Sequence, residues 1–338
     1  MSVHVEAGAA RPLHPRGGVL PMVLAGLVVC GLALISLFVG VSDVSLSNLL
    51  SSDPGDRPMQ VLLISRIPRT AALMLAGAAL SVTGLIMQML VRNRFVEPST
   101  AGTLESASLG LLVVTIFAPG LPVIGKMLVA AVFALGGTAL FLRLLAAIPL
   151  RSPLMVPLVG IMLGGVIGSV TAFFAYRYDL LQTLAAWRLG DFSGILRGRY
   201  ELLWLAAGLT GVAYFAADRF TVAGLGQDFT TNLGLNYRRV LAFGLSIVAM
   251  VTAVVVVTAG SIPFLGLIVP NLVSAAMGDN MRRSIPWIAL VGAGMVLACD
   301  IVGRLIRWPY EIPIGTVFGV LGSLMFLWLL LRRKNQFG

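Results

Sequence analysis

The sequence has few residues of the kinds that build metal sites, disulfides and acid–base catalytic centres. Its 338 residues include only two cysteines, Cys30 and Cys299, and two histidines, His4 and His14. Both cysteines lie in apolar runs without metal-ligand spacing, and both histidines precede the first apolar segment. These absences exclude an HExxH-type zinc hydrolase, a haem protein and a histidine proton relay. We therefore expect no catalytic residue, no metal site and no cofactor in this chain.

Charged residues are also scarce. They make up 11% of the chain, whereas an average soluble domain has about 25%. Hydrophobic residues account for 58% and the mean hydropathy is +0.96, more apolar surface than a soluble domain of this size could bury. The net charge of +10 is spread between apolar stretches, which does not favour binding to nucleic acid. The composition predicts an all-α membrane protein with many spans.

At about 20 apolar residues per span, the sequence predicts ten transmembrane helices in a single domain, 1–338. The predicted ranges are 20–41, 60–91, 104–118, 122–142, 154–175, 200–216, 239–259, 262–277, 286–307 and 313–331. Residues 1–18 form the expected cytoplasmic tail, and the first apolar stretch is expected to remain as a helix. The range 262–277 contains Pro263 and Pro270, so we expect a bent helix whose freed carbonyls bond to neighbouring helices.

The distribution of basic residues predicts that both termini lie in the cytoplasm. With ten spans the termini share one side of the membrane, and that side holds 14 of the 24 Lys and Arg residues, as the positive-inside rule expects. The polar stretch 217–239 then also lies in the cytoplasm. The arginines on the outer side leave two interpretations open: snorkelling at the interface, or a docking surface for an acidic soluble partner.

No segment of the sequence predicts a nucleotide site. Residues 120–127, GLPVIGKM, place Gly120, Gly125 and Lys126 as a phosphate-binding loop would, but Met127 replaces the Ser or Thr. The segment is also flanked by a membrane helix instead of a strand. The glycines around 224–234 are not a dinucleotide fingerprint either, because no strand precedes them. If ATP drives this protein, another chain must bind it.

The stretch 217–239, ADRFTVAGLGQDFTTNLGLNYRR, is a polar island with an apolar stripe. Leu225, Phe229 and Leu233 recur every four residues, which would place them on one face of a short helix. The glycines favour a break into two short helices, with Gly234 as a helix stop and Asn236 as the cap of the next helix. On the cytoplasmic side, such a stripe predicts docking to a soluble protein or to the membrane surface.

Three of the ionisable residues within predicted spans are candidates for a function or an ion pair. Glu105 lies near the start of the third span, where both a functional role and a solvated position at the interface remain open. Asp300 and Arg304 are four residues apart on the ninth span, which predicts a local ion pair. Because Arg304 is nearer the outer end, it is also a candidate for the docking surface.

Small residues recur at helical spacing in two predicted spans. They are Gly160, Gly164 and Gly168 in one span and Gly315 and Gly319 in another. Such stripes allow helix backbones to approach closely. The expected contact is within one subunit, with a contact between two copies as the alternative.

Five sequence blocks carry a specific resemblance. They are RIPRT (66–70), GAALSVTGLIMQ (77–88), NRFVEPSTAG (93–102), SIPFLGLIVPN (261–271) and YEIPIGTVFGVLGSLMFLWLL (310–330). In their order and spacing over nearly the whole chain, they resemble permease subunits of bacterial ATP-binding-cassette (ABC) importers for iron siderophores, haem and cobalamin. The resemblance implies a ten-helix subunit like the cobalamin-importer permease. It also implies a multi-pass protein of the bacterial cytoplasmic membrane, surrounded by lipid.

The resemblance further implies a set of partners. These are a second permease subunit, identical or homologous, two cytoplasmic ATPase subunits, and a periplasmic or lipid-anchored substrate-binding protein. In the family, the loop between helices six and seven forms two short coupling helices that enter a cleft of the ATPase. The resemblance assigns this role to the loop 217–239, with the coupling residues Leu225, Gly226, Gln227, Asp228, Phe229, Leu233 and Gly234.

Two more roles follow from the resemblance. Family arginines that receive acidic residues of the binding protein match Arg66 and Arg69 and, with a weaker match, Arg304. The cytoplasmic gate of the cobalamin relative uses an Asn-Pro-Leu turn, whose Asn and Leu align with Asn93 and Phe95. Arg94 stands here in place of the proline, so the gate geometry differs and a bulkier plug is expected.

The expected cargo is a ferric siderophore, and NRFVEPSTAGTL narrows this expectation toward catecholate siderophores by resemblance. Haem or cobalamin import is the alternative within the family. An ion-coupled secondary transporter would need ion sites at mid-membrane, for which Asp300 and Glu105 are the candidates. A membrane-embedded enzyme would need a nucleophile with a base in reach, and the sequence offers no convincing pair.

Overall fold

The computed structural model describes residues 19–40, 56–148, 155–278 and 280–334, and these residues form helices and connecting segments without a strand. The expected tail 1–18 lies outside the described residues. The helices are α1 (Val19–Phe38), α3 (Arg57–Val61), α4 (Ile67–Val91), α5 (Thr103–Phe117), α6 (Val123–Ala147), α7 (Met155–Arg177), α8 (Leu181–Arg188), α9 (Leu203–Phe215), α10 (Ala217–Gly224), α11 (Gln227–Asn232), α12 (Tyr237–Ala259), α13 (Leu265–Met277), α14 (Met281–Ile306) and α15 (Ile314–Lys334). A π-helical turn, Leu62–Arg66, joins α3 to α4.

The ten predicted ranges all coincide with helices. Among the described residues, six helices are long and apolar enough to cross a membrane, the first of them being α1 and the second α3 with α4. The bent pair of α9 and α10, with an angle of 65° between its parts, makes a seventh, and α5, α13 and α15 contain shorter apolar helices. The predicted all-α, multi-span fold class is confirmed.

Polar caps account for the helix starts that the hydropathy pattern placed too late. α12 begins at Tyr237, where the Asn236 side chain accepts a hydrogen bond from the Arg239 amide at 3.1 Å. The same arrangement at Asn280, 3.2 Å from the Arg283 amide, starts α14 at Met281 instead of the predicted 286. A side-chain oxygen that satisfies a free amide of the first turn stabilises a helix start. The prediction of Asn236 as a cap is confirmed.

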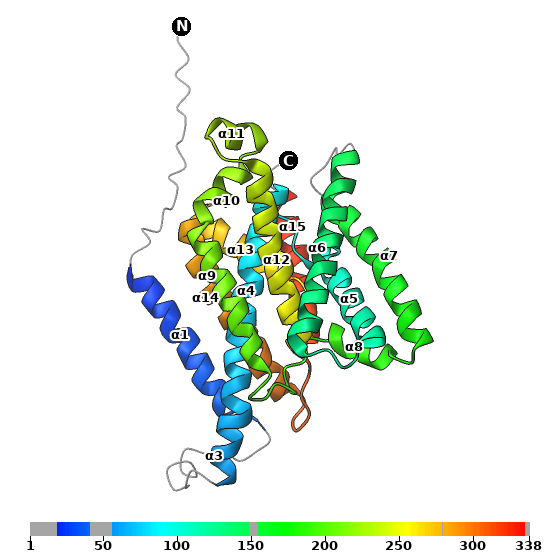
Figure 1. The fold of residues 1–338 in the computed structure, drawn as a ribbon. Helices are drawn as coiled ribbons and strands as arrows, with labels where there is room; N and C mark the ends of the chain where they lie inside the picture. The colour runs from blue at the N-terminus through cyan, green and yellow to red at the C-terminus, as the bar shows by residue number, and fades with distance from the viewer. Residues whose placement is uncertain (1–18, 41–55, 149–154, 279, 335–338) are drawn as a thin grey trace.

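α4 forms the centre of the bundle, and α1 and α7 lie at opposite edges (Figure 1). α4 packs against α9, α12, α13 and α14. Its contact with α13 is made backbone to backbone, because a Cβ at Gly84 would lie 1.9 Å from the Gly266 carbonyl oxygen. Small residues allow such close approach, which drives helix association where the solvent is lipid. α4 therefore connects the two ends of the molecule through a rigid core.

Pro270 lies inside α13, and the structure shows how the cost of that proline is offset. Proline has no amide hydrogen to donate to the carbonyl four residues earlier, which here belongs to Gly266. Gln88 of α4 is buried and donates through Nε2 to the Gly266 carbonyl at 3.3 Å and to the Leu267 carbonyl at 3.4 Å. The prediction that a neighbouring helix satisfies the freed carbonyl is confirmed.

Candidate coupling face, ion-pair network and gate

The stretch 217–239 folds as two short helices, α10 and α11, at one end of the bundle (Figure 1). The chain turns between them at Gly226, whose φ of +115° favours glycine. A single continuous helix through Leu225, Phe229 and Leu233 is therefore wrong, and the two-helix alternative is confirmed. The expected stop at Gly234 is also confirmed, with φ at +77°. Gln227 and Asp228 open α11 and are exposed.

The apolar stripe is largely exposed. Leu225, Phe229 and Leu233 are 56%, 62% and 64% exposed, respectively, so each presents more than half of its surface outward. α10 is anchored instead by other side chains, including the fully buried Phe220. The Thr230 hydroxyl fixes α11 to α10, because it lies 2.6 Å from the Gly226 carbonyl and 3.2 Å from the Val222 carbonyl. The result is a rigid loop with an exposed apolar tip, and its coupling role stays a prediction.

A largely buried network of four charged residues, Arg69, Asp300, Arg304 and Glu311, lies toward the opposite end, where α3 precedes α4 (Figure 1). Asp300 of α14, which is 1% exposed, pairs with Arg69 of α4 at 2.7 Å and with Arg304 one turn further along its own helix. Arg69 also pairs with Glu311 at 2.6 Å. Arg304 donates to the Ser36 and Val39 carbonyls at the end of α1. The predicted local ion pair of Asp300 with Arg304 is confirmed.

The arginines expected to dock a binding protein are engaged within the chain. Arg66 and Arg304 are 7% and 2% exposed, and Arg66 donates to the Val39 carbonyl. Arg69 is 11% exposed at its side chain, next to Glu311 at 29%. The network thus clamps α1, α4, α14 and the segment before α15 together. The docking role of Arg66, Arg69 and Arg304 stays a prediction, and their observed partners are intramolecular.

The expected gate residues lie in the turn that follows α4. Asn93 is buried and accepts a hydrogen bond from the Phe95 amide at 2.8 Å, an Asx-turn that shapes the loop without proline. Asn271 of α13 donates to the Arg94 carbonyl at 2.7 Å. The Phe95 ring packs edge-on against Phe326 of α15, with 6.1 Å between centroids. The structure brings Asn93 and Phe95 together, and their gating role stays a prediction.

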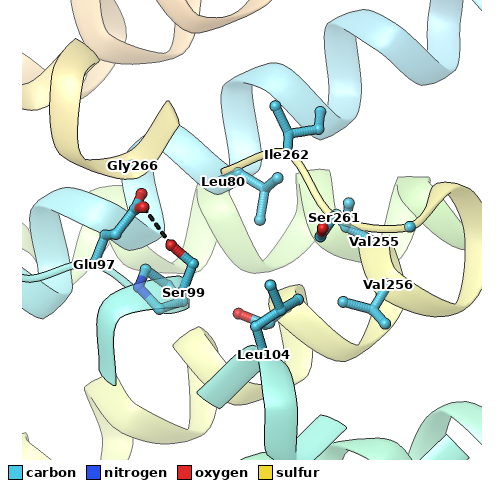
Figure 2. Close-up of a pocket in the computed structure, with 12 residues that line it drawn as sticks. Leu80, Glu97, Ser99, Leu104, Val255, Val256, Ser261, Ile262 and Gly266 are labelled. Carbon is cyan, nitrogen blue, oxygen red and sulfur yellow. Dashed lines mark hydrogen bonds between the residues drawn. The ribbon is translucent and has the colours of Figure 1, made fainter. Parts of the chain in front are cut away.

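Glu97, which follows this turn, was missed by the sequence reasoning. Figure 2 shows its carboxylate beside Ser99 and Gly266, on a small cavity of about 30 Å³. The carboxylate is 2% exposed and accepts hydrogen bonds from the Ser99 hydroxyl and, at 2.8 Å, from the Phe264 amide. It therefore caps the amide end of α13, where the helix dipole favours negative charge. Glu97 lies in the block NRFVEPSTAG, which the sequence already singled out. Its partner, the Phe264 amide, is 167 residues away, so no local pattern could reveal the contact.

Burial raises the pKa of Glu97 from 4.5 to about 7, although the hydrogen bonds from Ser99 and from the amides at the start of α13 partly offset this. The folded chain therefore binds a proton more tightly than the unfolded chain. Stability from this group is present below pH 4.5 and is lost as the pH rises through about 7. The loss should amount to roughly 3 kcal/mol. We expect the thermal midpoint of unfolding, measured in detergent, to decrease as the pH is raised from 5 to 8.

The matched variant for this prediction is Glu97→Gln, which keeps a hydrogen-bond acceptor and cannot ionise. Its thermal midpoint should depend much less on pH over the same range. The explanation is wrong if the variant and the parent protein lose stability in parallel between pH 5 and pH 8.

Known proteins share this architecture. Residues 27–332 match the model of the FecCD transport family. The chain is 49% identical over 304 residues to the petrobactin import system permease protein YclN of Bacillus subtilis, covering 90% of this chain and 95% of the relative. It is 42% identical over 322 residues to the petrobactin import system permease protein FatD of Bacillus anthracis, covering 95% and 94%. A solved metal-chelate type ABC transporter chain, described as inward-facing, superposes with a TM-score of 0.78 at 24% identity, covering 93% of this chain and 100% of that one.

The helical bundle has many apolar spans and the fold of the solved chain, and the family match and the two relatives define its class as a membrane transport permease. A transport subunit of this kind is not an enzyme, and ATP hydrolysis belongs to a separate chain. The chain belongs to the FecCD transport family, whose model matches it over nearly its whole length.

Proposed function

We propose that this chain is the permease subunit of an ABC importer that carries a ferric siderophore across the bacterial cytoplasmic membrane. The observation that carries the proposal is the similarity, at 49% and 42% identity, to two permeases named for petrobactin import. Both alignments cover at least 90% of each chain. Catecholate siderophores are the narrower class of cargo within this proposal.

The proposal includes the rest of the transport machine. A second permease, identical or homologous, would complete the pathway, and two ATPases would bind at the cytoplasmic face. A binding protein would deliver the cargo at the other face. The placement of the exposed stripe and the buried charge network at opposite ends supports this orientation, with both termini in the cytoplasm. ATP-driven closure of the ATPases would then shift a bistable helical bundle between two states.

The test uses proteoliposomes that contain the permease complex, its ATPase and its binding protein. We expect ATP-dependent uptake of iron-55 supplied as ferric petrobactin. Haem and cobalamin, supplied in the same way, should not be transported. Uptake by the permease without the ATPase, driven by an ion gradient, would overturn the proposal, and so would preferential transport of haem or cobalamin.

A further inference from the structure

A large cavity, open to the surface, lies between α7 and residues 99–108, and no role has yet been assigned to it. Its volume is about 650 Å³, within the range of about 300–1,000 Å³ that is typical of small-molecule sites. α5, α7, α8 and the segment that precedes α13 line it. The polar side chains of the lining include those of Glu105, Ser108, Ser169, Arg188 and Ser261. Few cavities inside a membrane bundle carry both a carboxylate and a guanidinium, since such groups are costly there and mark function.

Glu105 is held with unmet hydrogen-bonding capacity. It lies in the first turn of α5, and its Oε2 atom is buried without a hydrogen-bond partner in the described part of the chain. A buried acceptor without a donor costs free energy comparable to a lost hydrogen bond. A donor from a bound molecule would remove that cost.

Arg188 supplies the opposite charge from a second element, the last residue of α8. It acts electrostatically on Glu105. The end of α8 is fixed in place, because the Ser261 hydroxyl donates to the Arg188 carbonyl at 2.9 Å and the Ser261 amide donates to the Trp187 carbonyl at 3.1 Å. The guanidinium is therefore presented from an anchored backbone, and its exposed side chain retains donors for a ligand.

The glycine stripe of α7 makes room for both charges. At Gly160 the stripe allows close packing, since a Cβ would lie 1.9 Å from the Thr100 carbonyl oxygen. At Gly164 a Cβ would lie 3.2 Å from the Glu105 Cδ atom, and at Gly168 it would lie 3.4 Å from the Arg188 Nη2 atom. Gly160 serves the close helix packing expected from the spacing, and the Gly164 backbone also lies near Gly102. Gly164 and Gly168 leave space for charged side chains.

From this arrangement we infer that Glu105 and Arg188 are the two charged contacts that orient the cargo on the wall of this cavity during transit. The inference rests on the proposed function. The ligand class is a polar iron chelate whose anionic oxygens accept from Arg188 and whose N–H or O–H groups donate to Glu105. A negative and a positive contact orient a chelate, and both side chains keep their charge. The hydroxyls of Ser108 and Ser169 complete a polar wall.

The position of the cavity is also compatible with movement of the cargo through the molecule. Thr100 and Phe264 line it, and both residues neighbour the hydrogen-bonded Glu97 that caps α13. The site therefore adjoins the segment that follows the expected gate residues Asn93 and Phe95. A chelate bound there would be separated from the end of the molecule that carries α11 by that gate segment.

The first test fills the cavity at Gly165, which lines it and where a Cβ would meet no atom within 4 Å. The Gly165→Trp variant should lower ATP-dependent uptake of ferric petrobactin by about tenfold or more, because the indole occupies space that the cargo needs beside Glu105 and Arg188. The matched control is Gly136→Trp on α6, another exposed helical glycine with open space at its Cβ and no place in this cavity. It should transport as the parent does.

The second test changes the charges and uses a readout other than transport. Glu105→Gln and Arg188→Met should each raise the KM for ferric petrobactin. In a Cys30→Ala background, Ser169→Cys should react with a hydrophilic maleimide, and ferric petrobactin delivered by the binding protein should slow that reaction. These results would support the site.

Failure of this inference is distinct from failure of the proposed function. If the parent complex takes up ferric petrobactin with ATP while Gly165→Trp, Glu105→Gln and Arg188→Met all transport normally, the binding site is wrong and the permease function stands. Unchanged maleimide reactivity at position 169 in a transporting complex would likewise overturn the site. If the parent complex transports no iron chelate, the proposed function itself is wrong.

Discussion

Replacement of Phe229 by aspartate is expected to uncouple ATP hydrolysis from uptake while the permease remains folded and inserted. The ring is 62% exposed at the tip of the rigid α10–α11 loop and contributes nothing to the core. A large apolar side chain placed in a partner's groove is a typical hot spot, worth at least about 2 kcal/mol on binding. Uptake should fall by about 30-fold. The measurement is iron-55 uptake and ATP hydrolysis by the same proteoliposomes.

The control carries the same charge on the same short helix. Thr231 is exposed beside Phe229, and its hydroxyl donates only to the Gln227 carbonyl at 2.9 Å in its own turn. Thr231→Asp should retain most of the uptake. Normal uptake by Phe229→Asp would remove the coupling assignment from this residue, and equal losses in both variants would assign the effect to charge.

Replacement of Asp300 by alanine is expected to destabilise the permease by about 3–5 kcal/mol, the cost of leaving buried charges without their partner. Asp300 is 1% exposed and accepts from both Arg69 and Arg304. Its loss removes the carboxylate that pairs with Arg304, which is 2% exposed. The measurement is the fraction of folded protein in detergent after heating.

Glu311→Gln serves as the comparison, because this residue pairs with the same Arg69 from a position that is 29% exposed. Water can replace part of that interaction, so the loss should be within about 1 kcal/mol. Equal stability of the Asp300→Ala and Glu311→Gln proteins would show that the buried network is not what holds α1, α4 and α14 together.

Hydropathy alone placed the ten main helical segments, because apolar runs mark the helices that cover their backbone in lipid, the shorter α5, α13 and α15 included. It placed the starts of α12 and α14 too late, since the first turns of these helices are polar and are set by the caps Asn236 and Asn280. α8 was not predicted. Its eight residues are too short and too mixed in character to produce a span signal.

The candidate sites show more clearly that local sequence patterns do not reveal contacts between distant residues. The apolar residues of the polar stretch, Leu225, Phe229 and Leu233, could be picked out locally, although their four-residue spacing wrongly predicted one continuous helix. The burial of Arg69 could not, because its partners Asp300 and Glu311 are 231 and 242 residues away. Glu97 was missed for the same reason, since its role depends on the amide end of a distant helix.

The 65° bend between α9 and α10 has a mechanical consequence. α10 is joined to α11 across Gly226 by the Thr230 hydroxyl, so the loop behaves as a stiff arm set at an angle to α9. The Phe220 ring of this arm stacks on Phe243 of α12, with 6.1 Å between centroids, and α10 also rests on α4 and α14. A displacement imposed on the tip would therefore reach three core helices, α4, α12 and α14, through the direct contacts of α10.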